Sequence, residues 1–245
     1  MKTSEVRKEF VNLFEGLAQK YSRHQIWSDF IIMSACAISN ACDRRFFDVR
    51  EAMYMDCVKK YKREEAEVFP EMLSLVVVAF EINPEQDFLG EIFGSLRLHN
   101  EWRGQFFTPY HLARLMADIN TGSLVKDIEE KGTVSDCCCG AGCLLIAFAN
   151  SAKRAGVNYQ RNILFVAQDV DLIAGLMCYI QLSILGCKAY IKIGNSLTEP
   201  ITTDSDIDET FWFSPMYRMG NLLTFMELFD ETKNENFRQQ EEIPA

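Results

Sequence analysis

The sequence predicts an α/β protein in which a helical region precedes a parallel sheet, and three observations support this prediction. Residues 1–100 hold apolar side chains at helical spacing. From residue 132 onward, short apolar strands alternate with helical segments. Residues 135–142 read Ser-Asp-Cys-Cys-Cys-Gly-Ala-Gly, a strand end with a carboxylate and two glycines before a helix. This run, called the glycine corner below, is typical of a nucleotide-binding turn.

The N-terminal region is predicted to be a bundle of helices. Val6, Phe10, Leu13, Phe14 and Leu17 recur at the spacing of one helix face. Such stripes are typical of a bundle core, so we expect no chemistry in this N-terminal domain, residues 1–100. Further helices are predicted over residues 27–41, 49–62, 68–82 and 88–96.

The alternating region predicts three strands joined by helices. Its βαβαβ order implies a parallel sheet with right-handed crossovers. The strands are predicted over residues 133–137, 163–168 and 189–193, and the helices over 142–155 and 172–185.

A short aromatic run over residues 211–213 predicts a fourth strand. The α/β domain is therefore predicted to cover residues 101–226. Residues 227–245 are polar and acidic, and we expect them to form a disordered tail.

The composition excludes several classes of protein. The chain has 245 residues, of which 48% are hydrophobic, so it can bury a sizeable core. No apolar run reaches the length of a membrane span, and the charged N-terminus lacks the apolar core of a secretion signal. Nine cysteines, three of them consecutive, are typical of free thiols in a reducing compartment. We therefore expect a cytoplasmic protein without membrane contact.

The net charge of −10 argues against tight binding to nucleic acid by this chain alone. Phosphate contacts need a basic surface, whereas residues 199–245 hold 3 Lys and Arg against 11 Asp and Glu. Contact with DNA would therefore need a local basic patch or a partner subunit.

Polar residues follow each predicted strand at the edge where parallel sheets bind ligands. Asp136 ends the first strand, Asp169 the second, and Asn195 follows the third. A carboxylate at a strand end can accept hydrogen bonds from ribose hydroxyls, and a neighbouring polar side chain can contact an adenine edge. Upstream, Thr108 and Pro109 form a favourable helix start. The order of these segments favours one nucleotide-type site at the carboxyl edge of the sheet.

In these motifs the chain resembles the modification subunits of type I restriction systems and related adenine-specific DNA methyltransferases. That family reads Gly-Gln/Glu-Phe-Tyr/Phe-Thr-Pro, Asp-Pro-Ala-Cys-Gly-Ser-Gly-Gly, Gly-Gln-Glu/Asp, Gly-Asp-Thr/Ser-Leu and Asn-Pro-Pro-Tyr/Phe. The matching runs here are Gly-Gln-Phe-Phe-Thr-Pro at 104–109, the glycine corner, Gln-Asp at 168–169, Gly-Asn-Ser-Leu at 194–197 and Ser-Pro-Met-Tyr at 214–217.

The resemblance covers residues 88–217 and implies the Rossmann-like sheet of a methyltransferase that depends on S-adenosylmethionine (SAM). A complete sheet of this kind has seven strands, and only 28 residues follow Tyr217. The sheet is therefore expected to be incomplete at its C-terminal half.

The resemblance also implies roles in binding SAM. The Thr-Pro segment would hold the methionine end, the glycine corner would wrap the cofactor, and the acidic residue after Gln168 would hold the ribose. The residue after Gly194 would bind the adenine, and here it is Asn where Asp is usual. The implied cofactor-binding residues are Phe107, Thr108, Pro109, Asp136, Cys139, Gly140, Gly142, Asp169 and Asn195.

The resemblance places the catalytic motif at Ser214, Pro215 and Tyr217. In the family an Asn at the first position orients the target amino group, and the aromatic residue stacks on the flipped base. A serine hydroxyl can accept one hydrogen bond but cannot reproduce the amide. The implied reaction is direct methyl transfer from the sulfonium to the adenine amino nitrogen, without a metal. The implied partners are DNA and a separate specificity or partner subunit.

Two other interpretations remain. A catalytically inactive methyltransferase-like protein that binds SAM or a partner subunit is favoured by Ser214 and by the acidic tail. A dinucleotide oxidoreductase uses a similar corner, but its fingerprint needs a glycine near position 145, which is Leu145 here. The clustered cysteines are read as thiols that fill small volumes, because no second ligand pair follows at zinc spacing.

Overall fold

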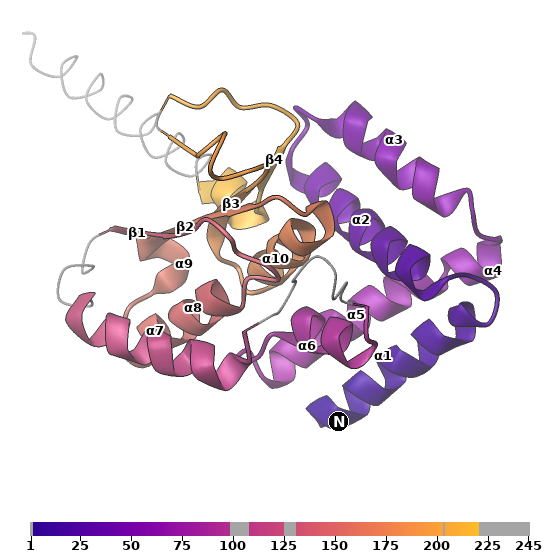
Figure 1. Ribbon diagram of the computed structural model, residues 1–245, viewed down its shortest axis with the longest axis horizontal. Helices are drawn as coiled ribbons and strands as arrows, with labels where there is room; N and C mark the ends of the chain where they lie inside the picture. Colours follow the sequence, from indigo (N-terminus) through magenta and orange to yellow (C-terminus); the bar gives the residue numbers. More distant parts are fainter. Residues whose placement is uncertain (1, 99–107, 125–130, 203, 221–245) are drawn as a thin grey trace, which may run out of the picture.

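The computed structural model describes residues 2–98, 108–124, 131–202 and 204–220. Figure 1 shows the N-terminal helices on one side of the molecule and the strands on the other. The N-terminal part contains α1 (Thr3–Ala18), α2 (Arg23–Cys42), α3 (Phe47–Val58), α4 (Arg63–Ala66), α5 (Val68–Ile82) and α6 (Phe88–Ser95). Next come α7 (Tyr110–Leu124), β1 (Gly132–Asp136), α8 (Cys143–Arg154), α9 (Tyr159–Asn162), β2 (Ile163–Asp169), α10 (Leu172–Ile184), β3 (Lys188–Ile193) and β4 (Phe211–Phe213).

The apolar stripe predicted on the first helix is buried. The Phe10 ring packs edge-to-face on Trp27, Phe30 and Phe88, with centroids 6.2, 5.4 and 5.8 Å apart. These contacts join α1 to α2 and α6. The helices predicted over 27–41, 49–62, 68–82 and 88–96 are present as α2, α3, α5 and α6.

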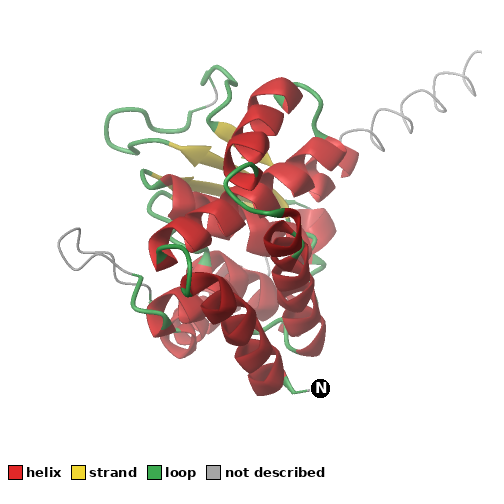
Figure 2. Ribbon diagram, turned by 90° about the vertical axis from the view of Figure 1, so that its right-hand side faces the viewer, coloured by secondary structure: helices red, strands yellow, loops and turns green. Residues whose placement is uncertain are grey.

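The sheet has the order β1-β2-β3-β4, and its first three strands are parallel, as predicted. Asp136 at the end of β1 lies opposite Ala167, and Asp169 at the end of β2 lies opposite Ile193. The carboxyl ends of the three strands therefore meet at one edge. Figure 2 shows the strands gathered in one part of a mainly helical molecule.

The fourth strand is present but runs in the opposite direction. β4 pairs antiparallel with β3, with Phe213 opposite Tyr190 and Phe211 opposite Lys192. Arg50 of α3 donates a hydrogen bond to the Phe211 carbonyl at 2.6 Å, and its guanidinium lies 4.3 Å from the Trp212 ring centre. This contact holds β4 against the N-terminal helices. Because β4 is antiparallel to β3, the chain that leaves β4 lies near the amino end of β3.

α7 packs on α8 and carries apolar side chains on a flank that the described residues leave exposed. Its buried positions are Ala113, Ala117 and Thr121, one turn apart. The exposed side chains are Leu112 at 46%, Leu115 at 57%, Met116 at 49% and Ile119 at 68%. Among the described strands, β1 pairs with β2 alone, so its other edge has no partner strand in this part of the chain.

The predicted α/β fold, in which N-terminal helices precede the sheet, is confirmed, and the described residues form four strands of the seven in a complete sheet. One cluster of buried residues extends from Val6 in α1 to Trp212 in β4. The division into residues 1–100, 101–226 and 227–245 stays a prediction, and the tail lies outside the described residues. No described helix has the length and apolar character needed to cross a membrane.

Candidate cofactor-binding site

Main-chain hydrogen bonds hold the glycine corner against the end of β2. The Cys139 N–H donates to the Gln168 carbonyl at 3.0 Å. The Gly140 N–H donates to Oδ2 of Asp169 at 2.8 Å. Two segments that lie 29 residues apart in sequence are thereby joined at the carboxyl edge.

The conformation of the corner favours glycine at two positions. Gly140 has φ 53° and Gly142 has φ 90°, both in the left-handed region. A Cβ on Gly142 would also lie 2.8 Å from Sγ of Cys178 on α10. Gly142 therefore permits both the turn and the close approach of α10, and it directly precedes the first residue of α8.

Asp169 joins the corner to the other strand ends. Its Oδ1 accepts a hydrogen bond from the Asp171 N–H at 2.9 Å, and its main-chain carbonyl accepts one from the Gly194 N–H at 2.9 Å. Each carboxylate oxygen has a second lone pair, so the group can still accept hydrogen bonds from ligand hydroxyls.

A second carboxylate lies at the end of β1. Oδ1 of Asp136 accepts a hydrogen bond from the Cys138 N–H at 3.1 Å. Burial raises the pKa of Asp136, the Cys138 hydrogen bond opposes the rise, and the negative charge of Asp169 adds to it. The two carboxylates are thus close enough to interact.

The Thr-Pro segment reaches the same edge. Cys143, the first residue of α8, donates a thiol hydrogen bond to the Thr108 carbonyl at 3.2 Å. The Pro109 carbonyl accepts from the Ala113 N–H at 3.2 Å and so opens α7, as the sequence predicted. Phe107 lies outside the described residues.

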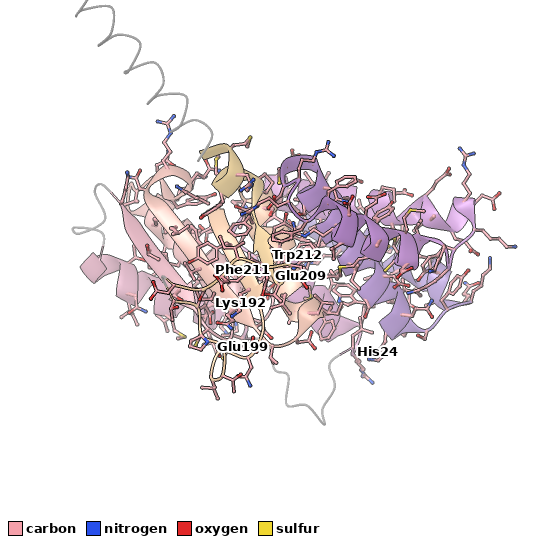
Figure 3. The ribbon with its side chains drawn as sticks, turned by 90° about the horizontal axis from the view of Figure 1, so that it is seen from above. His24, Lys192, Glu199, Glu209, Phe211 and Trp212 are labelled. Atoms are coloured by element: carbon pink, nitrogen blue, oxygen red, sulfur yellow. The ribbon has the colours of Figure 1, made fainter. Side chains whose placement is uncertain are left out.

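The loop after β3 folds over the strand ends. Oδ1 of Asn195 accepts a hydrogen bond from the Leu197 N–H at 2.9 Å. The Gln168 amide and the Lys192 ammonium both donate to the Glu199 carbonyl, each at 2.9 Å. Figure 3 shows Lys192 and Glu199 close together beside β4.

Two apolar residues at this edge were missed in the sequence. Val170 follows Asp169 and is 71% exposed, and Leu197 in the next loop is 91% exposed. Covering a large apolar side chain lowers the free energy of the system. Both residues are therefore candidates for contact with an apolar ligand face. The signal in the sequence is an apolar residue within four positions of a strand end, among polar neighbours.

The structure does not bring the residues of the predicted catalytic motif to this edge. The Ser214 hydroxyl is fully buried, donates to the Cys187 carbonyl at 2.7 Å and accepts from the Ala189 N–H at 2.9 Å. These partners flank the first residue of β3, so Ser214 lies one strand length, about 17 Å, from the carboxyl edge. Because β4 runs antiparallel, a motif that follows it falls at the amino edge.

Pro215 and Tyr217 follow Ser214 at the same end of β4. The Tyr217 ring lies 5.0 Å from the Phe213 ring and 5.7 Å from the Tyr190 ring, centre to centre. It therefore packs on the aromatic edge formed by β3 and β4. The catalytic roles assigned to Ser214, Pro215 and Tyr217 stay a prediction, and their placement gives that prediction no support.

The described residues contain no group of three or more His, Cys, Asp or Glu side chains placed to hold a metal ion. The nine cysteines are free thiols. Burial raises the pKa of Cys143, and the pKa of Cys139 is also raised, through its contact with Cys178 first and burial second. Raised thiol pKa values disfavour the thiolate that metal binding requires.

Comparison with known proteins shows the family of this chain. The family model described as N-6 DNA methylase matches residues 85–218, which is more than half of the chain and includes every element that forms the edge. The chain belongs to the N-6 DNA methylase family. Methyltransferases of this family in type I restriction-modification systems use SAM as methyl donor.

One similar solved structure is the methyltransferase subunit of a type I restriction-modification system from Streptococcus thermophilus. The sequence identity is 11%, the TM-score is 0.46, and the match covers 84% of this chain and 61% of that subunit. This chain thus spans about three fifths of the length of that relative. No curated protein matches the chain.

Proposed function

We propose that this chain is the cofactor-binding half of a SAM-dependent adenine DNA methyltransferase. The hydrogen bond between the Gly140 N–H and Asp169 carries the proposal, because it joins two strand ends into one ligand-binding edge. Thr108 is held at the same edge through Cys143. When bound, SAM supplies an activated methyl group, and this chain supplies binding and orientation.

The residues at the edge fit the chemistry of SAM. Asp169 keeps acceptor capacity for the ribose hydroxyls. Val170 and Leu197 offer exposed apolar surface for the two faces of the adenine ring. Asn195 accepts from the main chain through Oδ1, which leaves two Nδ2 hydrogens to donate to adenine ring nitrogens. The N-terminus of α8 and Thr108 are assigned to the amino acid end.

The placement of Ser214 bears on whether this chain transfers the methyl group by itself. Its hydroxyl is committed to the main chain on both sides of Lys188. This placement favours the second candidate, a methyltransferase-like chain that binds SAM or a partner without transferring the methyl group by itself. Residues that orient the adenine amino group would then come from elsewhere.

DNA contact is proposed to occur through a separate subunit. The net charge of −10 disfavours phosphate contacts by this chain. The exposed apolar flank of α7, defined by Leu112, Leu115, Met116 and Ile119, supports a protein partner. A cytoplasmic location is proposed from the free thiols.

Titration calorimetry with SAM tests the proposal. The full chain should bind SAM with one site, and NAD should not compete. The double variant Val170→Ala/Leu197→Ala should bind at least about fivefold more weakly, because apolar contact with the adenine is lost. Val49→Ala, at a residue 49% exposed on α3, is the matched control and should bind like the parent chain.

A radiolabelled methyl-transfer assay on varied duplex DNA distinguishes the two candidates. Binding without transfer supports the inactive or half-protein interpretation. Transfer to DNA by the isolated chain would contradict it, and failure to bind SAM would contradict the proposed function as a whole.

A further inference from the structure

A buried glutamine links the glycine corner to the N-terminal helices. Gln181 of α10 is fully buried. Its Nε2 donates to Oδ1 of Asp87 and to the carbonyl of Ala141, both at 2.8 Å, and its Oε1 accepts from the Leu89 N–H at 3.0 Å. Only an amide side chain can donate twice and accept once in this way.

The bond to Ala141 fixes the corner at its centre. Ala141 lies between the two glycines with positive φ and is itself fully buried. The Gly140 N–H before it is held by Asp169, and the Gly142 N–H after it donates to the Cys139 carbonyl at 2.8 Å. A buried carbonyl that loses its hydrogen-bond donor is unfavourable, so loss of this contact would favour a different path of the corner.

The other end of the link is built into α6. Asp87 is the N-cap of α6, is 2% exposed, and accepts a second hydrogen bond through Oδ1 from the Gly90 N–H at 2.9 Å. A Cβ on Gly90 would lie 2.1 Å from Oδ2 of Asp87, so the glycine makes room for the carboxylate. The carboxylate is therefore held on α6 and directed at Gln181.

Three charged or titratable groups face this carboxylate from the surrounding elements. Burial raises the pKa of Asp87 to about 6, Glu91 on α6 adds to the rise, and Arg7 on α1 opposes it. Cys143 on α8 is also within range, because the charge of Asp87 raises the pKa of its thiol.

We propose that Gln181 is a positioning residue for the cofactor, through which Asp87 and the start of α6 set the shape of the glycine corner and hence the affinity for SAM. The inference rests on the proposed function. The N-terminal helices then contribute to cofactor binding without touching the cofactor.

A matched pair of glutamine variants tests this role. Gln86 is 3% exposed, donates through Nε2 to the Ala79 and Asn83 carbonyls at 2.8 and 2.7 Å, and accepts from Arg7 at 3.3 Å; none of these partners belongs to the glycine corner. Gln181→Met and Gln86→Met each remove a buried amide while keeping its length. We expect Gln181→Met to weaken SAM binding at least about tenfold and Gln86→Met to change it less than about twofold, by calorimetry on the full chain.

Amide hydrogen exchange of the ligand-free chain gives a readout that does not depend on SAM. Exchange in peptides covering residues 137–145 should accelerate in Gln181→Met and stay unchanged in Gln86→Met. Equal exchange and equal affinity in the two variants would overturn the inference. If the parent chain does not bind SAM, the proposed function fails and the cofactor role fails with it, while unchanged exchange alone overturns the link to the corner.

Asp87→Asn provides the conservative variant. An asparagine Oδ1 can accept both hydrogen bonds, so SAM binding at pH 7.5 should stay within about threefold of the parent. The parent should lose affinity as the pH falls from 7 to 5, because a protonated Asp87 orients Gln181 less strongly. Asp87→Asn should lose less over the same range. Parallel pH profiles in the two proteins would contradict the role of Asp87.

Discussion

The N–H of Gly140 donates a hydrogen bond to Oδ2 of Asp169 over 2.8 Å, so a residue of the turn after β1 is held by the last residue of β2. The same carboxylate accepts the Asp171 N–H through its other oxygen. Asp169 thus organises the edge while it keeps lone pairs for a ligand.

Replacing this carboxylate should reduce cofactor affinity. Asp169→Ala removes charge-assisted hydrogen bonds to the main chain, and we expect SAM binding to weaken at least about tenfold by calorimetry. Asp208 is the matched control, because its Oδ1 also accepts a main-chain N–H two residues on, from Thr210 at 2.9 Å. Similar losses of affinity in Asp169→Ala and Asp208→Ala would argue against a ligand at this edge.

Alanine at Gly142 should destabilise the chain more than alanine at Gly156. Both glycines have φ near 90°, so the backbone strain is shared. At Gly156 nothing lies within 4 Å of the added Cβ, whereas at Gly142 it meets Sγ of Cys178 at 2.8 Å. We expect Gly142→Ala to lower the free energy of unfolding by about 1–3 kcal/mol more than Gly156→Ala, measured by urea denaturation. Cys178→Ala should recover part of the difference, and an equal effect at the two glycines would contradict the close approach of α10.

Ser214→Ala should affect stability and leave cofactor binding unchanged. The hydroxyl bonds to Cys187 and Ala189, and the Tyr217 N–H donates to it at 3.2 Å. Leaving these buried main-chain groups unpaired should cost about 1–3 kcal/mol in the free energy of unfolding. A folded Ser214→Ala chain that keeps SAM binding but loses a methyl-transfer activity present in the parent would support the catalytic assignment.

Asp87 should make the parent chain relatively more stable in acid. Its pKa is about 6 in the folded state against 3.8 in the unfolded chain, so the folded state binds the proton more tightly. This contribution is fully present below pH 3.8 and is lost as the pH rises toward 6. The difference in unfolding free energy between the parent and Asp87→Asn should therefore shift in favour of Asp87→Asn between pH 4 and 6. A difference that is constant over this range would contradict the raised pKa.

Much of the fold could be predicted because its elements have strong periodicity. The apolar residues of α5 predict a buried helix directly, and the alternation of strands and helices after residue 132 predicts that β1, β2 and β3 run parallel. The direction of β4 could not be predicted, because three residues carry no information on strand polarity. That direction depends on contacts with distant residues, such as the Arg50 hydrogen bond to Phe211.

The part of the candidate site that depends on strand ends and turns could be predicted from the sequence. The glycines and Asp169 can be found from strand ends and turn chemistry alone. Gln181 could not be found, because a single glutamine in an apolar helix looks like any tolerated polar residue until its partners are known. The family resemblance implied a catalytic role for Ser214, but the order of motifs along the chain does not determine the edge of the sheet at which a residue emerges.

The antiparallel course of β4 has a further consequence for how sequence motifs are transferred between relatives. If β4 ran parallel to β3, residues 214–217 would emerge near Gly194, at the carboxyl edge where the cofactor is proposed to bind. With the antiparallel course, the Ser214 hydroxyl instead links the first residues of β3 to the helical residues that follow β4. The direction of one short strand therefore determines which margin of the sheet a downstream motif occupies, whatever its resemblance to relatives.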